Sequence, residues 1–330
     1  MTVNVNLAER SYAITIEHGI LNRAADYINL KRKVLIVTDN GVPAEYAQTI
    51  AKQCKTPVTV TVPQGEESKT FPIFEHLCRT MLENGFNRHD CVVAVGGGVI
   101  GDLSGFAAAS FMRGIDFYNI PTTVLSQVDS SIGGKVAINL DKIKNIIGAF
   151  YQPKAVLIDP DVLNTLPARQ IANGLAEAIK MGLTSDKDLF ALFQKDDYIA
   201  NLDQIIERSL LVKKSVVEKD EKEGGLRKIL NFGHTIGHAF ESNNLGDLYH
   251  GECVALGMLF MCSEGVKEKL IPVLKRVGLP INIKYDKNSI IEVLKHDKKS
   301  IDDSVSVVFV SEIGKFDITE KTITELGDLL

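Results

Sequence analysis

The segment CVVAVGGGVIGD, residues 91–102, decides the fold of the first half of the chain. Its apolar run, residues 91–95, predicts a buried strand, and three consecutive glycines at 96–98 follow that strand directly. Glycine lets the backbone approach a ligand closely, and a helix that begins here presents free N–H groups to a phosphate. The segment therefore predicts a strand, a turn and a helix, in which the turn either binds a dinucleotide or is only a tight structural turn.

The spacing G-x-G-x-x-G occurs at residues 96–101, but the acidic residue that usually accompanies it is out of place. In a Rossmann fold that acid lies about 20 positions further on, at the end of a strand, where it contacts a ribose. Asp116 has this separation but would begin the strand predicted at 117–120. Asp39 is better placed, because it follows the predicted strand 33–38 and is positioned to hydrogen-bond an adenosine ribose.

Around this segment, the first half alternates β-branched runs with amphipathic stretches, which is the pattern of βαβ units. Strands are predicted at residues 12–17, 33–38, 58–62, 91–95, 117–120 and 155–158. From residue 168 to about residue 270 helical periodicity dominates, and only one later run, 305–310, resembles a strand. We therefore expect an α/β nucleotide-binding domain with a mainly parallel sheet, residues 1–167, a mainly α-helical domain, residues 168–330, and a binding cleft between them.

The composition limits the function. A length of 330 residues favours two domains. A formal net charge of -5 argues against a nucleic-acid partner, so an anionic ligand must be bound by local cations. The five cysteines are scattered without a C-x-x-C pair and indicate buried thiols of a reducing compartment. The polar start of the chain lacks the features of a secretory signal, and no apolar stretch is long enough to cross a bilayer, so we expect a cytoplasmic location and no membrane partner.

A candidate metal site lies in the helical half. His234 and His238, in NFGHTIGH, are one helical turn apart and project from the same face. Thr235 stands where a zinc hydrolase needs glutamate, which argues against a metalloprotease. His250 and Glu177 are further candidates, since a carboxylate on the apolar helix GLAEAIKMG is costly without a partner. The alternative is that these are capping or satisfied core residues.

A set of basic residues has apolar or glycine-rich surroundings that are unusual for surface charge. It comprises Lys135, Lys144, Lys180, Lys213, Arg227 and Lys298. Each residue alone is ordinarily solvated surface charge, whereas their convergence in the fold would create an anion site.

Taken together, several segments resemble the 3-dehydroquinate synthase family of sugar-phosphate cyclases. They are PQGEESK (63–69), GGGVIGDLSGFAAASFMRGIDF (96–117), IPTTVLSQVDSSIGGK (120–135), KNIIGAFYQP (144–153), GLAEAIK (174–180), DEKEGGLRKILNFGHTIGHAFE (220–241) and HGECVALGM (250–258). The likeness fades after residue 258, except at HDKK (296–299). The sequence departs from the family pattern at Val136-Ala137 and at Ala178, which leaves room for a related cyclase with another substrate.

The resemblance implies an NAD-binding α/β domain, a mainly helical metal-binding domain and a homodimer. It implies Glu177, His234 and His250 as ligands of a divalent metal, Zn²⁺ or alternatively Co²⁺, whereas helical spacing alone pairs His234 with His238. It implies NAD binding by Asp39, Glu66, Lys69, Gly97, Gly98, Asp102, Thr122 and Thr123, together with Lys135 and Lys144. For the substrate it implies Asp129, Lys135, Lys144, Asn145, Lys180, Lys213, Arg227, Asn231, His238 and Lys298, with Arg113 reaching a neighbouring subunit's site.

The implied reaction converts 3-deoxy-D-arabino-heptulosonate 7-phosphate to 3-dehydroquinate and phosphate, the second step of the shikimate pathway. It proceeds by transient oxidation with NAD, β-elimination of phosphate, reduction and intramolecular aldol closure. The alternatives are a sister cyclase that makes an inosose or valiolone, a metal-dependent polyol dehydrogenase, and a sensor that keeps the fold without the chemistry. Net NADH production would distinguish the dehydrogenase.

Overall fold

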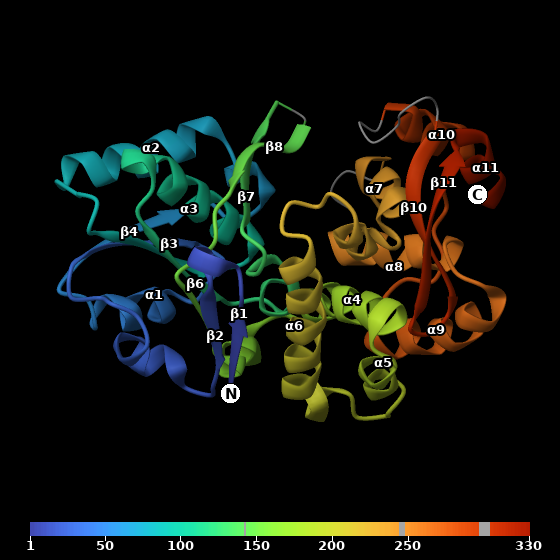
Figure 1. Cartoon of the computed structure of the whole chain (residues 1–330), viewed down its shortest axis with the longest axis horizontal. Helices are drawn as coiled ribbons and strands as arrows, with labels where there is room; N and C mark the ends of the chain where they lie inside the picture. Colours follow the sequence, from blue (N-terminus) through green and yellow to red (C-terminus); the bar gives the residue numbers. More distant parts are fainter. Residues whose placement is uncertain (142, 244–247, 297–303) are drawn as a thin grey trace. The chain divides into compact units, whose positions relative to one another are not determined.

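The computed structural model describes residues 1–141, 143–243, 248–296 and 304–330. The chain divides into two compact units, Met1–Leu166 and Pro167–Leu330, one residue away from the division expected from the sequence. The two units have different architectures (Figure 1). None of the helices in the described ranges combines the length and the apolar character needed to cross a membrane.

The first unit contains a seven-stranded sheet with the order β1-β2-β9-β6-β5-β3-β4. Neighbouring strands run parallel except β1 and β2. The strands are β1 Thr2–Val5, β2 Tyr12–Ile16, β3 Lys33–Asp39, β4 Thr56–Val62, β5 Cys91–Gly96, β6 Asp116–Pro121 and β9 Ala155–Ile158. Each strand predicted for this half is present, and the expected mainly parallel α/β fold is confirmed.

The inner strand β5 is buried along its whole length, so both of its faces must be covered. Helices α2 (Phe71–Glu83) and α3 (Gly98–Ser110) pack on one face, where Leu103 and Leu77 join a core with Val92. Helix α1 (Ala44–Ala51) lies on the opposite side (Figure 1). Since α3 follows β5 after Gly97 alone, its first turn lies at the carboxyl end of the sheet.

A separate antiparallel hairpin, β7 (Lys135–Leu140) and β8 (Ile143–Phe150), packs against α3. The packing is close, because a side chain at Gly105 of α3 would overlap Val136. The register of the hairpin shifts between Ile138 and Leu140. The sequence analysis placed no strand here, since the mostly exposed β8 alternates only weakly between apolar and polar residues.

The second unit is mainly helical, as predicted. Its helices are α4 Ala168–Ser185, α5 Lys187–Phe193, α6 Leu202–Lys219, α7 His234–Asn243, α8 His250–Phe260, α9 Glu264–Val277, α10 Lys287–His296 and α11 Ile323–Leu329. The unit also contains the hairpin β10 (Ser304–Glu312) and β11 (Lys315–Thr322). The expectation of a single late strand was wrong, because β11 is mostly exposed and polar and has no apolar run to reveal it.

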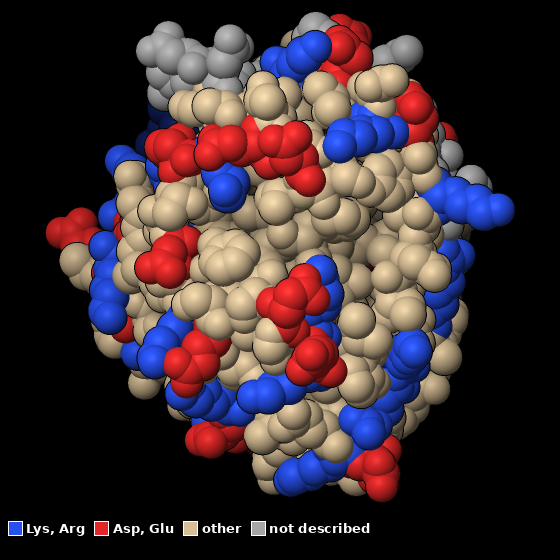
Figure 2. Space-filling view, turned by 90° about the vertical axis from the view of Figure 1, so that its right-hand side faces the viewer, with Lys and Arg blue, Asp and Glu red and all other residues tan. Residues whose placement is uncertain are grey.

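Helix α8 forms the centre of this unit, where nearly all of its residues are buried. A helix that is apolar all round has to be enclosed, and α4 and α7 pack against it. Helix α8 can pack closely against α7 because residue 257 is glycine. A side chain at Gly257 would overlap the carbonyl oxygen of Gly233, which directly precedes α7. On the face shown in Figure 2, basic and acidic side chains are interspersed, with a run of Lys and Arg along its right-hand edge.

Candidate active site

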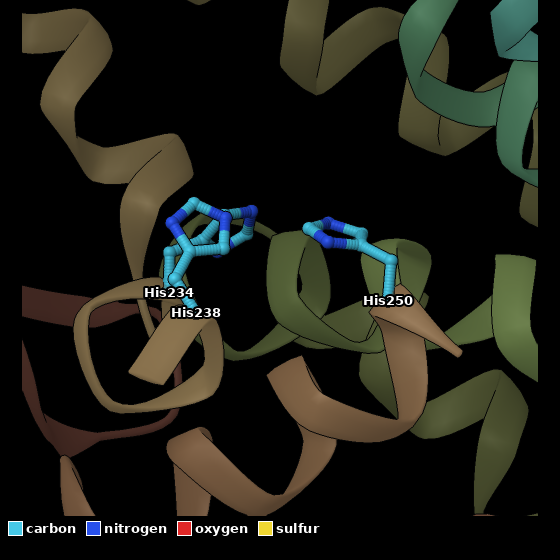
Figure 3. A group of neighbouring side chains, drawn as sticks. All are labelled: His234, His238 and His250. Atoms are coloured by element: carbon cyan, nitrogen blue, oxygen red, sulfur yellow. The ribbon is translucent and has the colours of Figure 1, made fainter. Parts of the chain in front are cut away.

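Three histidines from two helices lie together in the second unit (Figure 3). His234 and His238 project from α7 and His250 begins α8, and one ring nitrogen of each lies within 4.8 Å of the others. Glu177 of α4 joins them: its Oε1 is 3.7 Å from Nε2 of His234 and 3.6 Å from Nε2 of His250. The structure therefore brings Glu177, His234 and His250 together, with His238 beside them.

The donor atoms fit a divalent cation. Oε1 of Glu177 is buried and accepts no hydrogen bond from the described residues, which is costly for a carboxylate oxygen. A tetrahedral zinc ion with bonds of about 2.1 Å holds its ligand atoms roughly 3.4 Å apart, close to the distances seen here. A cation bound by Glu177, His234 and His250 would satisfy the buried oxygen. His238 lies close enough to contact a group bound to that cation.

The two candidate histidine ligands are oriented through their other ring nitrogens. Nδ1 of His234 lies 3.1 Å from the carbonyl oxygen of Phe232, and Nδ1 of His250 lies 3.0 Å from Oε2 of Glu241. Such partners fix the ring and direct Nε2 toward a metal. The first turn of α8 is also anchored, because the Gly251 N–H donates to Oδ1 of Asn173 at 2.7 Å.

The charges of the cluster suit a cation site. Burial would raise the pKa of Glu177, but the adjacent Lys180 ammonium and His250 lower it below its usual value. Burial and the neighbouring Lys180 lower the pKa of His234, which therefore stays neutral and keeps a lone pair. Burial also disfavours the charge on His250, yet the Glu177 and Glu241 carboxylates raise its pKa to about 9. A metal would have to displace that proton, since only neutral imidazole is a ligand.

Three of the basic residues predicted for the substrate are buried in the second unit, and one of them, Lys180, lies beside this cluster. Lys180 on α4 is 2% exposed and pairs with Oε2 of Glu177. Lys213 on α6 and Arg227 on the short helix Leu226–Asn231 are 5% and 2% exposed, and these two elements are in contact. Lysine and arginine are rarely buried to this extent in a fold without a function or a partner for their charge.

The loop that carries Arg227 is closed by one side chain. Asp220 accepts hydrogen bonds from the N–H groups of Gly224, Gly225 and Arg227 at 2.8, 2.7 and 2.9 Å. These bonds, led by the one from Arg227, hold the pKa of Asp220 below its usual value. Asn231 ends the short helix and donates from Nδ2 to Oε1 of Glu223 at 3.0 Å. The loop is therefore fixed from both ends.

In the first unit, the glycine turn has the features of a phosphate-binding helix end. Gly97 precedes α3 without a side-chain cap, so the first N–H groups of the helix have no internal acceptor. A side chain at either glycine would be crowded, since a Cβ at Gly97 would lie 3.2 Å from the Thr123 side chain and one at Gly98 would lie 3.0 Å from Oγ of Ser130. Thr122 and Thr123 directly follow β6, and the Thr122 N–H donates to the Gly96 carbonyl at 3.0 Å.

The structure places Asp39 and Asp116 at opposite ends of the sheet. Asp39 ends β3, whose Val37 pairs with Ala94 of the neighbouring strand β5, so its carboxylate lies at the same edge as the glycine turn. Burial raises the pKa of Asp39, although the N–H groups of Gly41 and Val42 oppose that shift. Asp116 begins β6 and pairs with Arg32 at 2.7 Å. Of these two carboxylates, it is that of Asp39 that lies at the edge of the sheet with the glycine turn.

Lys69 is the centre of a polar network in the first unit. Its Nζ lies 2.7 Å from Oδ2 of Asp102 and 3.7 Å from Oε1 of Glu66, and it also contacts Oδ1 of Asn145. Lys69 is 3% exposed, so the flanking carboxylates stabilise a buried charge. Three residues predicted for NAD and one predicted for the substrate thus share one cluster.

The remaining predicted residues are more dispersed. Lys135 and Lys144 are exposed on β7 and β8, and Asp129 lies on the turn Ser126–Ser130. Arg113 is exposed and has a left-handed backbone, with φ of 67°, which is unusual for arginine. Lys298 lies outside the described residues.

Four residues that the sequence analysis did not single out contact these groups: Glu241, Asn173, Glu223 and Asn139. A signal existed for Glu241, which is seven positions after His234 and thus on the same face of α7. Asn173 and Asn139 gave no such signal, because they act on residues distant in sequence.

Family comparisons agree with this arrangement. The model for the 3-dehydroquinate synthase N-terminal domain matches residues 59–173, and that for the C-terminal domain matches residues 174–300. A 3-dehydroquinate synthase of Clostridium beijerinckii is 41% identical over 97% of this chain and 98% of its own length.

Two solved structures of cyclases are also similar. A 2-deoxy-scyllo-inosose synthase complexed with carbaglucose-6-phosphate, NAD⁺ and Co²⁺ is 28% identical, with a TM-score of 0.91 over 100% of this chain and 99% of that chain. The 2-epi-5-epi-valiolone synthase of Streptomyces hygroscopicus, with NAD⁺ and Zn²⁺ bound, is 26% identical, with a TM-score of 0.88 over 98% of this chain and 97% of that one.

Proposed function

This chain belongs to the 3-dehydroquinate synthase family, and we propose that it converts 3-deoxy-D-arabino-heptulosonate 7-phosphate to 3-dehydroquinate and phosphate. The observation that carries the proposal is the buried Glu177 oxygen placed between His234 and His250, next to the buried Lys180. A metal site lined by cations suits a substrate that has a hydroxyl to be oxidised as well as two anionic groups.

We assign NAD to the first unit and a divalent metal, Zn²⁺ or Co²⁺, to the second. NAD would bind at Gly97, Gly98 and Asp39, and the metal at Glu177, His234 and His250. When bound, NAD supplies a reversible hydride acceptor, and the metal supplies Lewis acidity toward the substrate oxygen. Similar cyclases crystallised with NAD⁺ and with Co²⁺ or Zn²⁺ support this assignment.

The protein's own residues bind and orient the substrate. Arg227 is suited to bind a carboxylate or phosphate through two hydrogen bonds, and the Asp220 loop fixes its backbone. Lys180 and Lys213 add buried positive charge, which is strongest toward an anion where water is excluded. Holding a flexible sugar in the reactive geometry can contribute about 7–11 kcal/mol to catalysis.

The test is release of phosphate by the purified protein with this substrate, NAD and zinc, while NADH absorbance is followed. We expect phosphate without accumulation of NADH. Accumulation of NADH from simple polyols without phosphate release would instead identify a polyol dehydrogenase. Phosphate release only from sugar phosphates that lack a carboxylate would identify a sister cyclase.

A substitution tests whether Arg227 binds an anionic group of the substrate. The Arg227→Ala enzyme is expected to lose at least about 30-fold in kcat/KM, since truncating a buried charged partner costs about 2–5 kcal/mol. Arg79→Ala is the matched control, because Arg79 is 66% exposed and pairs only with Glu75 among the described residues. Equal kcat/KM for both variants and the native enzyme would remove Arg227 from the site.

We also propose a cytoplasmic homodimer in which Arg113 reaches the neighbouring subunit's site. The exposed Arg113 with its left-handed backbone supports a role outside its own subunit, and the free cysteines are compatible with a reducing compartment. Sedimentation should give twice the chain mass. Mixing inactive Arg113→Ala chains with inactive Glu177→Gln chains should restore part of the activity, and no recovery would contradict the sharing of Arg113.

A further inference from the structure

The hairpin β7–β8 contains an irregularity opposite a single residue. Ile138 pairs with Ile147 and Leu140 pairs with Ile143, so Asn139 alone faces the three residues 144–146 of β8. Such a bulge re-aims side chains and needs support, because the ladder of backbone hydrogen bonds is interrupted there. Two residues of the proposed substrate site, Lys144 and Asn145, lie in this bulge.

Asn139 supports the bulge through its side chain. Its Oδ1 accepts a hydrogen bond from the N–H of Asn145 at 2.8 Å. Asn145 has φ of 55°, a left-handed conformation that asparagine tolerates better than most residues. The contact therefore fixes the backbone of Asn145 in a conformation that the strand would not adopt alone.

The same side chain also contacts the nucleotide side of the first unit. Nδ2 of Asn139 donates to Oε1 of Glu66 at 2.9 Å, and the backbone N–H of Asn139 donates to the Lys69 carbonyl at 2.7 Å. Glu66 begins the short helix Glu66–Ser68 and Lys69 follows it, and Lys69 in turn contacts Asp102 of α3. The Asn139 amide therefore bonds through Nδ2 to a proposed NAD contact, Glu66, and through Oδ1 to a proposed substrate contact, Asn145.

We propose that Asn139 is a positioning residue that joins the NAD-contacting loop at Glu66 and Lys69 to the substrate-contacting bulge at Lys144 and Asn145. The inference rests on the proposed function for the identity of the two ligands. Through Asn139, a change in the loop on binding NAD is transmitted to Asn145, so that NAD and substrate affinity are linked. Asn139 itself need not touch either ligand.

The polarity of the contact allows a sharp test. Asn139→Asp keeps an oxygen for the Asn145 N–H but places a second carboxylate oxygen against Glu66, and we expect the Kd for NAD to rise about tenfold. Adding Glu66→Gln supplies an amide that can donate to the new carboxylate. The double variant should then bind NAD about as well as Glu66→Gln alone, a deviation from additivity of at least about fivefold.

Asn139→Ser removes both side-chain contacts at once, because the shorter side chain reaches neither Glu66 nor the Asn145 N–H. It should raise the Kd for NAD and the KM for substrate together, whereas Asn139→Asp should raise the Kd for NAD more than the substrate KM. Melting temperatures are compared so that this split is read only in folded protein, and Asn139→Ser keeps the proposal testable if Asn139→Asp does not fold.

NAD affinity is measured by titration without turnover, so its outcome is separate from the proposed reaction. If the native protein binds NAD but releases no phosphate, the proposed function fails while the double-variant comparison still stands. Additive effects of Asn139→Asp and Glu66→Gln on NAD affinity, or an unchanged Kd and KM in Asn139→Ser, would overturn the positioning role.

Discussion

Glu241 shows how a residue outside the proposed ligand set controls the site. Its Oε2 lies 3.0 Å from Nδ1 of His250 and orients that ring. We predict that Glu241→Gln weakens zinc affinity about 10- to 100-fold, as loss of such partners does in other metal sites. Competition with a chelator of known affinity measures the change. Glu264→Gln serves as control, because Glu264 is 81% exposed in α9, and equal zinc affinity of both variants would contradict the orienting role.

Local sequence patterns were sufficient to predict the position of a side chain where that position depends only on the strand or helix that carries it. Asp39 was preferred to Asp116 because one ends a strand and the other begins one, and the structure has both as expected. Local chemistry made Glu177 and His250 metal candidates, but only the family resemblance combined them with His234 as the ligand set, since nothing in helical spacing relates α4 to α8. Asn139 was missed because its role depends on a bulge that the sequence does not announce.

Close contact between α7 and α8 positions two proposed metal ligands, and Gly257 permits it. We predict that Gly257→Ala destabilises the protein by about 1–3 kcal/mol, because the added methyl group would overlap the Gly233 carbonyl. It should also weaken zinc binding. Gly265→Ala is the matched control, since nothing lies within 4 Å of its added Cβ in α9, and it should stabilise by about 0.5–1 kcal/mol. Urea unfolding measures both, and equal effects would contradict this view of the packing.

Asp186 at the start of α5 is expected to stabilise the folded protein in a pH-dependent way. Asp186 caps α5 through the N–H groups of Asp188 and Leu189 and accepts two hydrogen bonds from Arg208 at 2.9 and 2.7 Å. Burial would raise the pKa of Asp186, but Arg208 and the capping bonds lower it below its usual value. The folded state therefore binds this proton less readily than the unfolded chain, and the stabilisation is present above a pH of about 4 and lost as the pH falls through the lowered pKa.

Accordingly, Asp186→Asn should lower the free energy of unfolding by about 1 kcal/mol at pH 7, after allowance for solvent screening of the ion pair. The difference from the native protein should shrink as the pH falls below about 4. Asp188→Asn is the control, because Asp188 contacts the same Arg208 but is 83% exposed, so its effect should be a few tenths of a kcal/mol. A difference for Asp186→Asn that persists unchanged at acid pH would refute the charge argument.

Apolar periodicity was sufficient to predict the six parallel strands and the helical character of residues 168–270, but it missed β1 and β7, which also have buried residues. Elements with little burial were not found. β11 and β8 are mostly exposed, so their residues are not selected for an apolar pattern, and their pairing with β10 and β7 is what makes them strands. These hairpins depend on tertiary context, which a local pattern does not contain.

We propose that NAD and the metal bind to different units of the molecule, and hydrogen exchange can test the two assignments separately. We predict that NAD alone slows amide exchange in residues 91–110 and 63–69, and that zinc alone slows exchange in α7 and α8. A ligand at 100 times its Kd stabilises the state it binds by about 2.7 kcal/mol, which is ample for detection. Protection of α7 and α8 by NAD alone, with none near Gly97, would reverse the assignment.

The proposed reaction cyclises the substrate with no net oxidation. The most direct measurement uses substrate carrying deuterium on C5, the carbon proposed to be oxidised and reduced again, with mass spectrometry of the product and quantification of phosphate. We predict one phosphate per product, deuterium retained at that carbon and no accumulated NADH. Deuterium recovered in accumulated NADH, with an oxidised product and no phosphate, would contradict it.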